Sequence, residues 1–279
     1  MELLERILSC SSDEEIDEVI ATSVTDANKT ATPVEQIGFL DYGKENYLFR
    51  GFIPFETRIK YSSMDIETYG METTDFFYEF AHILKKYNIS SKGALIYNIE
   101  PFINSYFGFA GKQDRGQIFY DAAWNSTTTD EEFFDALKNN RLGDLKGKGA
   151  AECTERGALA QQLLSLFGVD TYYCMGCVDL GTKQEGHCFN IVKRNNDYAL
   201  LDYSVPVPVY NNEGKRRGFY PFVGALSNEE FEEFVASGTL KSFREYKFVD
   251  GKAVALDSER TYVVGSYEIK KEDTSGIKK

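Results

Sequence analysis

The sequence predicts an α+β fold in which one long helix packs against an antiparallel sheet. A leucine-rich segment with apolar residues at helical spacing, 153–167, ends at Gly168, a natural stop for a helix. Three strand-like segments follow it directly: 169–180, 187–193 and 198–205. The pair Asn195-Asn196 separates the last two as a hairpin turn would. A helix followed by a block of sequential strands is typical of the α+β class.

Other elements are predicted by capping signatures and by periodicity. Ser12 with Glu15, and Thr129 with Glu132, have the spacing of a capping box, which marks the start of a helix. Residues 35–70 mix aromatic and polar residues and predict no definite element. Helices are expected within 1–20, over 74–87, after Thr129 and near 228–236, and strands near 244–265.

The length of 279 residues allows one large domain, and 42% hydrophobic residues indicate a folded core. We expect residues 1–70 to form a helical or irregular N-terminal extension. Residues 71–265 would form the main domain, and the charged tail 266–279 would be disordered.

A net charge of −13 argues against a nucleic-acid binder, which needs a basic surface, and against adsorption to anionic membranes. The acidic start of the chain does not resemble a secretory signal, and no apolar run is long enough to span a bilayer. Five cysteines, an odd number, do not indicate a disulfide framework. These observations favour a cytoplasmic protein.

The residues most informative about function are Cys153, His187 and Asp202, separated by 34 and 15 positions. A thiol, an imidazole and a carboxylate in this order suggest a nucleophile, its base and the group that orients the base. Cys153 stands at the start of the predicted helix, where the helix dipole and an imidazolium would favour the thiolate. Glu152 and Glu155 oppose that effect electrostatically.

The predicted hairpin allows a geometric check of this trio. With Asn195-Asn196 as the turn, Arg194 lies opposite Asp197. His187 and Asp202 then share one face of the sheet as diagonal neighbours, with Cα atoms about 7–8 Å apart. Side chains of that length can meet in a hydrogen bond, whereas a turn one residue longer would place them on opposite faces.

Other motifs carry less weight. Cys174 and Cys177, with His187-Cys188 downstream, have the residue types of a zinc site, but two residues three apart on a strand face opposite ways. Glycines between 143 and 149 lack the spacing of a phosphate loop. His82, within an apolar helix, is assigned a structural role. No metal and no cofactor is implied.

Over residues 145–210 the chain resembles the core of the transglutaminase-like superfamily. The resemblance is carried by GKGAAECTERGALAQQLLSLFGVDTYYCMGCVDL and by GHCFNIVKRNNDYALLDYSVP. The matching positions are Cys153, Gly168, Gly176, His187 with Asn190 and Val192, and Leu201-Asp202 with Pro206. Cys188 stands where the family favours a small residue, and Phe189 where tryptophan is common.

The resemblance implies a papain-like fold with Cys153 as nucleophile, His187 as base and Asp202 as orienting group. Members include cysteine peptidases, deamidases, amide cross-linking enzymes and inactive binding proteins. We therefore expect a thiol-dependent amide hydrolase or acyltransferase that acts on peptide or protein substrates through a thioester. The alternative is a non-catalytic protein of this fold that serves as a binding or scaffold module.

Overall fold

The computed structural model describes residues 2–38, 48–60, 68–72, 74–108, 114–181, 184–238 and 241–264. Over these residues the protein is a mixed α/β molecule with eight α-helices, one 3-10 helix and two sheets, as the predicted α+β class requires. None of the described helices is both long and apolar enough to cross a membrane. The tail 266–279, expected to be disordered, lies outside the described residues.

The larger sheet has nine strands and is antiparallel at every pairing except that of β8 with β11. Its order is β10-β7-β6-β5-β12-β11-β8-β9, with β2 also pairing with β5. The strands are β2 (Leu48–Arg50), β5 (Thr171–Asp179), β6 (Gln184–Lys193), β7 (Tyr198–Leu201), β8 (Val207–Tyr210), β9 (Arg216–Tyr220), β10 (Phe222–Leu226), β11 (Lys241–Val249) and β12 (Lys252–Val264). A small second sheet contains β1 (Gln36–Gly38), β3 (Arg58–Lys60) and β4 (Thr68–Gly70).

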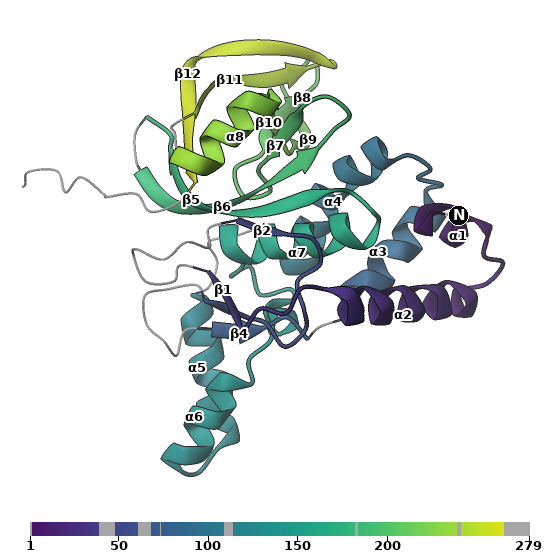
Figure 1. The fold of residues 1–279 in the computed structure, drawn as a ribbon, viewed down its shortest axis with the longest axis vertical. Helices are drawn as coiled ribbons and strands as arrows, with labels where there is room; N and C mark the ends of the chain where they lie inside the picture. Colours follow the sequence, from purple (N-terminus) through teal and green to yellow (C-terminus); the bar gives the residue numbers. More distant parts are fainter. Residues whose placement is uncertain are drawn as a thin grey trace, which may run out of the picture.

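Helices cover both faces of the large sheet. Figure 1 shows α7 (Cys153–Leu166) and α8 (Asn228–Ser237) on opposite sides of β5 and β6. Alternate residues of β6 accordingly enter two different apolar clusters: Cys188 packs with α7, and Phe189 packs with α8. The other helices are α1 (Leu3–Ser9), α2 (Asp13–Thr30), α3 (Asp75–Lys86), α4 (Lys92–Phe107), α5 (Arg115–Ser126), α6 (Asp130–Lys138) and the 3-10 helix η1 (Leu142–Leu145).

Helix α7 is buried on nearly all sides, although the leucine-rich pattern of 153–167 predicted one apolar face, the leucine stripe. Gln161 and Gln162, which lie off that stripe, are fully buried. The Gln162 side chain accepts a hydrogen bond from the Ile53 amide at 2.7 Å and donates one to the Ile53 carbonyl at 2.9 Å. The segment around residue 53 therefore covers the polar face of α7 and satisfies it.

Residues 1–70 contribute to the same apolar core as the rest of the chain. Ile7 of α1 and Ile20 of α2 are fully buried in one cluster with Phe77 and Phe80 of α3. Both α1 and α2 contact α3, and α2 also contacts α7. The division of the chain at residue 70 stays a prediction.

Helices α5 and α6 form a hairpin that projects from the rest of the molecule (Figure 1). The predicted capping box starts α6: the Thr129 hydroxyl accepts from the Glu132 amide, and the Glu132 carboxylate accepts from the Thr129 amide. The two helices bury only Phe119, Ala123 and Leu137. Most of the hairpin surface is therefore open to solvent.

Candidate functional site

Cys153 is the first residue of α7, as predicted. The Glu155 carboxylate, one turn into the helix, accepts a hydrogen bond from the Glu152 amide at 2.8 Å and so fixes the start of the helix. Helix α7 lies close to strand β5 at Gly157. A Cβ built on this glycine would lie 2.9 Å from the ring of Tyr173, so a larger residue would not fit. Cys153 is half-buried and its thiol is free.

The β6–β7 hairpin has the predicted register. Asn190 pairs with Leu201, and Lys193 pairs with Tyr198, as a turn at Asn195-Asn196 requires. Strand β7 ends at Leu201, earlier than the predicted residue 205. Asp202 is thereby placed just beyond the last strand residue.

The register brings His187 and Asp202 together. Nε2 of His187 lies 2.8 Å from Oδ2 of Asp202, and both side chains are buried. Since Nε2 contacts the carboxylate, Nδ1 is the ring nitrogen left for the hydrogen bond with Cys153. The hydrogen bond that the register predicted between these two side chains is present.

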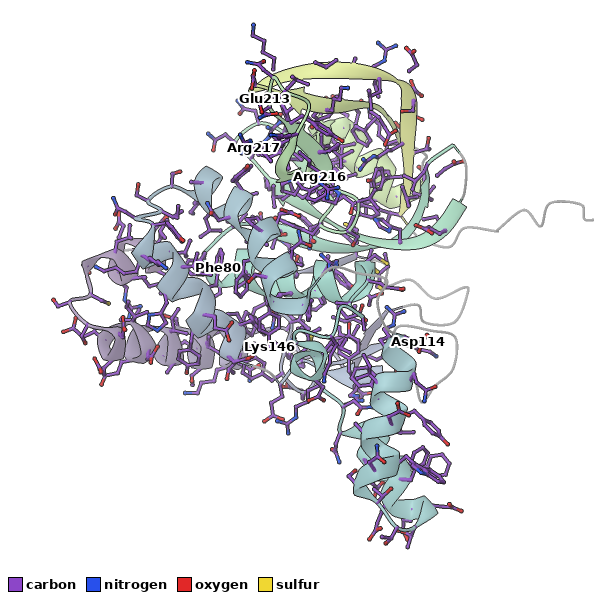
Figure 2. The ribbon with its side chains drawn as sticks, turned by 180° about the vertical axis from the view of Figure 1, so that it is seen from behind. Phe80, Asp114, Lys146, Glu213, Arg216 and Arg217 are labelled. Atoms are coloured by element: carbon purple, nitrogen blue, oxygen red, sulfur yellow. The ribbon has the colours of Figure 1, made fainter. Side chains whose placement is uncertain are left out.

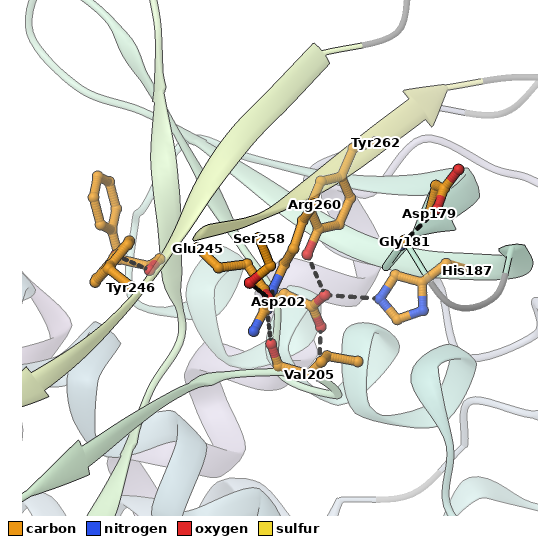
Figure 3. Close-up of polar contacts among 11 residues, drawn as sticks. Asp179, Gly181, His187, Asp202, Val205, Glu245, Tyr246, Ser258, Arg260 and Tyr262 are labelled. Atoms are coloured by element: carbon orange, nitrogen blue, oxygen red, sulfur yellow. Dashed lines mark hydrogen bonds and ion pairs between the residues drawn. The ribbon is translucent and has the colours of Figure 1, made fainter. Parts of the chain in front are cut away.

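Asp202 accepts three further hydrogen bonds, of which Figure 3 shows those from Val205 and Tyr262. The amides of Ser204 and Val205 donate to Oδ1 at 2.9 Å, and the Tyr262 hydroxyl donates to Oδ2 at 2.6 Å. Tyr262 lies on β12, and no sequence motif pointed to it. The carboxylate is thus held by groups from two separate parts of the chain.

A second ion pair, between buried Arg260 and half-buried Glu245, fixes the turn after Asp202. Arg260 of β12 donates from Nε to Glu245 of β11 at 2.6 Å and from Nη1 to the Val205 carbonyl. Figure 3 shows this pair beside the carboxylate of Asp202. Strands β11 and β12 therefore support the residues that bind Asp202.

For both His187 and Asp202, burial shifts the pKa in one direction and the charge of the partner shifts it in the other. Burial would lower the pKa of His187, but the negative charge and hydrogen bond of Asp202, with the contact to Cys153, raise that pKa to about 10. Burial would raise the pKa of Asp202, but His187 and the hydrogen bonds from Tyr262 and Val205 hold it below its ordinary value. The pair is therefore an imidazolium and a carboxylate at neutral pH.

The environment of Cys153 favours its thiolate. A hydrogen bond from the Cys188 thiol, followed by the hydrogen bond and charge of His187, holds the pKa of Cys153 well below its ordinary value against the effect of burial. Burial instead raises the pKa of Cys188. Both sulfurs lie close to the Thr154 hydroxyl, at 3.9 Å for Cys153 and 3.8 Å for Cys188. Cys188, which the sequence did not assign to the site, is therefore part of it.

The acidic neighbours of Cys153 both form ion pairs with Arg115. Its Nη1 lies 3.0 Å from Glu155, which is fully buried, and 3.2 Å from Glu152. The electrostatic opposition expected from these two carboxylates is thus offset by a cation from α5.

The remaining cysteines and the second histidine lie apart from this network. Burial raises the pKa of Cys174 and raises that of Cys177 to about 11. Within the described ranges no group of three or more His, Cys, Asp and Glu side chains is arranged to hold a metal ion. His82 on α3 lies 2.9 Å from Asp17 of α2 and so joins two helices.

Gly176 has a structural reason to be glycine. It pairs with His187 on one side and with Val264 on the other, and a Cβ there would lie 1.8 Å from the Val263 carbonyl oxygen. Only a residue without a side chain lets β12 come this close to β5. The approach places Tyr262 within reach of Asp202.

Comparison of the chain with protein families, with curated proteins and with solved structures found no match. A thiolate at a helix N-terminus can attack an electrophilic carbon, and an oriented imidazolium beside it can protonate the leaving group.

A cavity of about 590 Å³ lies elsewhere, between the start of α4 and the β6–β7 hairpin. Tyr97, Lys193, Tyr220 and Phe222 are among its lining residues, and none of the trio is. It is separate from the thiol site.

Proposed function

We propose that this protein is a thiol-dependent amide hydrolase or acyltransferase of papain-like, transglutaminase-like architecture, acting on peptide or protein substrates. The observation that carries the proposal is the buried hydrogen bond between His187 and Asp202, made next to a thiol whose pKa is lowered at the start of α7. A structural cysteine needs no such partner, because a buried thiol is an unreactive apolar group.

The proposed reaction uses each of the three residues once. The Cys153 thiolate attacks the carbonyl carbon of a peptide or glutamine amide, and the backbone N–H of Cys153 donates to the developing oxyanion. The C–N bond then breaks, and the His187 imidazolium gives its proton to the leaving amine. Asp202 keeps the ring oriented while its charge changes.

The thioester left on Cys153 is resolved by a second nucleophile. Water or an amine gives its proton to the neutral His187 and attacks the carbonyl carbon, and the C–S bond breaks to restore thiolate and imidazolium. Water gives the hydrolase reaction, and an amine gives the transferase reaction.

A labelling experiment tests the proposal without a known substrate. The rate of iodoacetamide alkylation at each cysteine is measured from pH 5 to 9 by peptide mass mapping. We expect selective labelling of Cys153 at about pH 6, where a free thiol near pKa 8.5 is almost wholly protonated. The same preparation contains internal controls, since burial raises the pKa of Cys174 and Cys177.

The two histidines provide a matched pair of variants. His187→Ala should abolish labelling of Cys153 at low pH, whereas His82→Ala should leave it unchanged, because His82 contacts α2 and not the thiol. Labelling of Cys153 that rises only near pH 8.5, or that is the same in both variants, would contradict the proposal. That outcome would favour the binding or scaffold alternative.

A further inference from the structure

The α5–α6 hairpin carries a continuous patch of exposed aromatic rings. Tyr120, Trp124 and Phe134 are 46%, 63% and 49% exposed, and Phe133 lies between them half-buried. The Tyr120 and Trp124 rings are stacked at 6.1 Å with an interplanar angle of 8°, and Phe133 contacts both edge-on. We call these four side chains the hairpin aromatic patch.

The patch is unusual for this molecule. Seven large hydrophobic side chains are exposed among the described residues, and three of them lie on this one hairpin. The only tryptophan of the chain is one of the three. Aromatic residues gathered on an exposed, projecting element are typical of interaction surfaces, where tryptophan and tyrosine contribute most of the binding energy.

The hairpin that carries the aromatic patch is acidic. Residues 114–138 contain six acidic and two basic side chains. Of the two bases, Arg115 is already paired with Glu155 and Glu152. Asp121, Asp130, Glu131 and Asp135 are exposed. A partner that covers the rings must therefore bring positive charge to the rim.

We propose that the hairpin aromatic patch is a docking site for a cationic amphipathic segment of a partner protein. The apolar face of that segment would cover Trp124 and Phe134, and its lysines or arginines would lie against Glu131 and Asp135. A second copy of this chain fits less well, because two identical acidic rims would repel each other. Nucleic acid and anionic lipid are disfavoured for the same reason.

Arg115 joins the base of the hairpin to the thiol site through ion pairs with Glu155 and Glu152. Arg115, the first residue of α5, contacts Glu155 in the first turn of α7, two residues from Cys153. Figure 2 labels Asp114, the N-cap of α5, at the base of the hairpin. The docking proposal itself does not depend on the thiol chemistry, and its test uses no enzymatic activity.

The single tryptophan makes the test direct. The probe is a synthetic peptide of about 14 residues, four turns of helix, that contains only leucine and lysine at amphipathic spacing. Because the peptide has no tryptophan, a blue shift of the emission on titration reports burial of Trp124. Isothermal titration gives the affinity of variants that lack this reporter.

Variants locate the binding on the patch. We expect Trp124→Ala and Phe134→Ala each to weaken binding about tenfold or more, as loss of a central aromatic contact does. The double change Glu131→Lys with Asp135→Lys should weaken binding and reduce its salt dependence. Tyr87→Ala is the matched control, since Tyr87 on the far end of α3 is also 63% exposed and should leave binding unchanged.

Three results would overturn the proposal. The first is that Trp124 emission does not shift at peptide concentrations up to about 100 µM, the scale of a weak complex. The second is that the Trp124→Ala and Tyr87→Ala variants bind the peptide with equal affinity. The third is that a leucine–glutamate peptide of the same pattern binds equally well. A blue shift that depends on protein concentration without peptide, together with a dimer mass by light scattering, would assign the patch to self-association instead.

Discussion

The thiol site and the α5–α6 hairpin depart from the usual distribution of side chains in opposite directions. The site buries charged groups, with His187, Asp202 and Glu155 at most 2% exposed. The hairpin exposes apolar rings, with Trp124 63% exposed. In the site the buried groups named here have partners inside the protein, whereas among the described residues nothing covers the rings. The buried charges of the thiol site are satisfied within the protein, whereas the exposed rings of the hairpin would be covered only by a binding partner.

Replacing one aspartate by alanine in each region should give the largest difference in stability, with the greater loss at Asp202. Asp202→Ala leaves the His187 charge, the Tyr262 hydroxyl and two amides without their acceptor, and we expect a loss of about 3–5 kcal/mol in the free energy of unfolding. Asp135→Ala on the hairpin removes an exposed partner of Lys138 and should change it by less than about 1 kcal/mol. Urea unfolding followed by circular dichroism measures both, and similar losses would contradict the assigned network.

A smaller contrast is expected from removing one hydroxyl. Tyr262→Phe deletes a hydrogen bond to a buried carboxylate, which we expect to cost about 1.5–3 kcal/mol. Tyr120→Phe makes the same change on an exposed ring and should alter stability by less than about 0.5 kcal/mol. The buried variant should also label more slowly at Cys153, because the base is less well oriented. An unchanged labelling rate would show that Tyr262 acts on stability alone.

The pH dependence of stability separates the two charges of the site. Because the folded pKa of His187 is about 10, its stabilisation is complete below about 6.5 and is lost as the pH rises towards 10. Because the folded pKa of Cys153 is lowered, its stabilisation is complete above about 8.5 and is lost as the pH falls. Between these two values the contributions cancel, so the wild-type stability should be flat from about pH 6.5 to 8.5.

Cys153→Ala removes the contribution of the thiolate to the pH dependence of stability and leaves that of His187. Stability of the variant should fall above about pH 6.5, by up to about 1.4 kcal/mol per pH unit. Below about pH 4 both proteins should lose stability, because the lowered pKa of Asp202 means that its contribution disappears on protonation. Unfolding curves recorded at intervals of one pH unit test this, with His82→Ala as the variant that should follow wild type. A flat profile for Cys153→Ala would mean that Asp202 alone does not raise the pKa of His187.

The smallest effect is expected where the hairpin exposes its rings. Trp124→Ala should change the free energy of unfolding by less than about 1 kcal/mol, because an exposed ring leaves no cavity when it is removed. A larger loss would mean that the hairpin aromatic patch is a structural element, and would weaken the case for docking. Differential scanning calorimetry beside Tyr87→Ala provides the measurement.

Local sequence signals predicted one half of the site well. The start of α7, its stop at Gly168 and the register set by Asn195-Asn196 depend on neighbours within a few residues, and the structure has them as predicted. Tyr262 lies 60 residues beyond Asp202, and its role depends on β12 pairing with β5. No periodicity within either segment contains that information.

The misses elsewhere have similar causes. Helix α4 contains Gly93 and, in its interior, Pro101, both of which favour a break, yet it forms because Ile99, Phe102 and Ile103 are buried. Gln161 and Gln162 lie away from the leucine-rich face of the helix, and they are buried because a segment more than 100 residues away supplies hydrogen bonds to them. Tertiary context overrode local preference in both places.

The ion pair between Arg115 and Glu155 limits how this architecture can be trimmed. A projecting hairpin looks like an insertion that could be cut out and replaced by a short connection. Here the excision would remove the cation that faces a fully buried carboxylate in the first turn of α7. The shortened protein would leave the buried Glu155 carboxyl without its cation beside the thiol, so excision of the hairpin would also perturb the helix that bears Cys153.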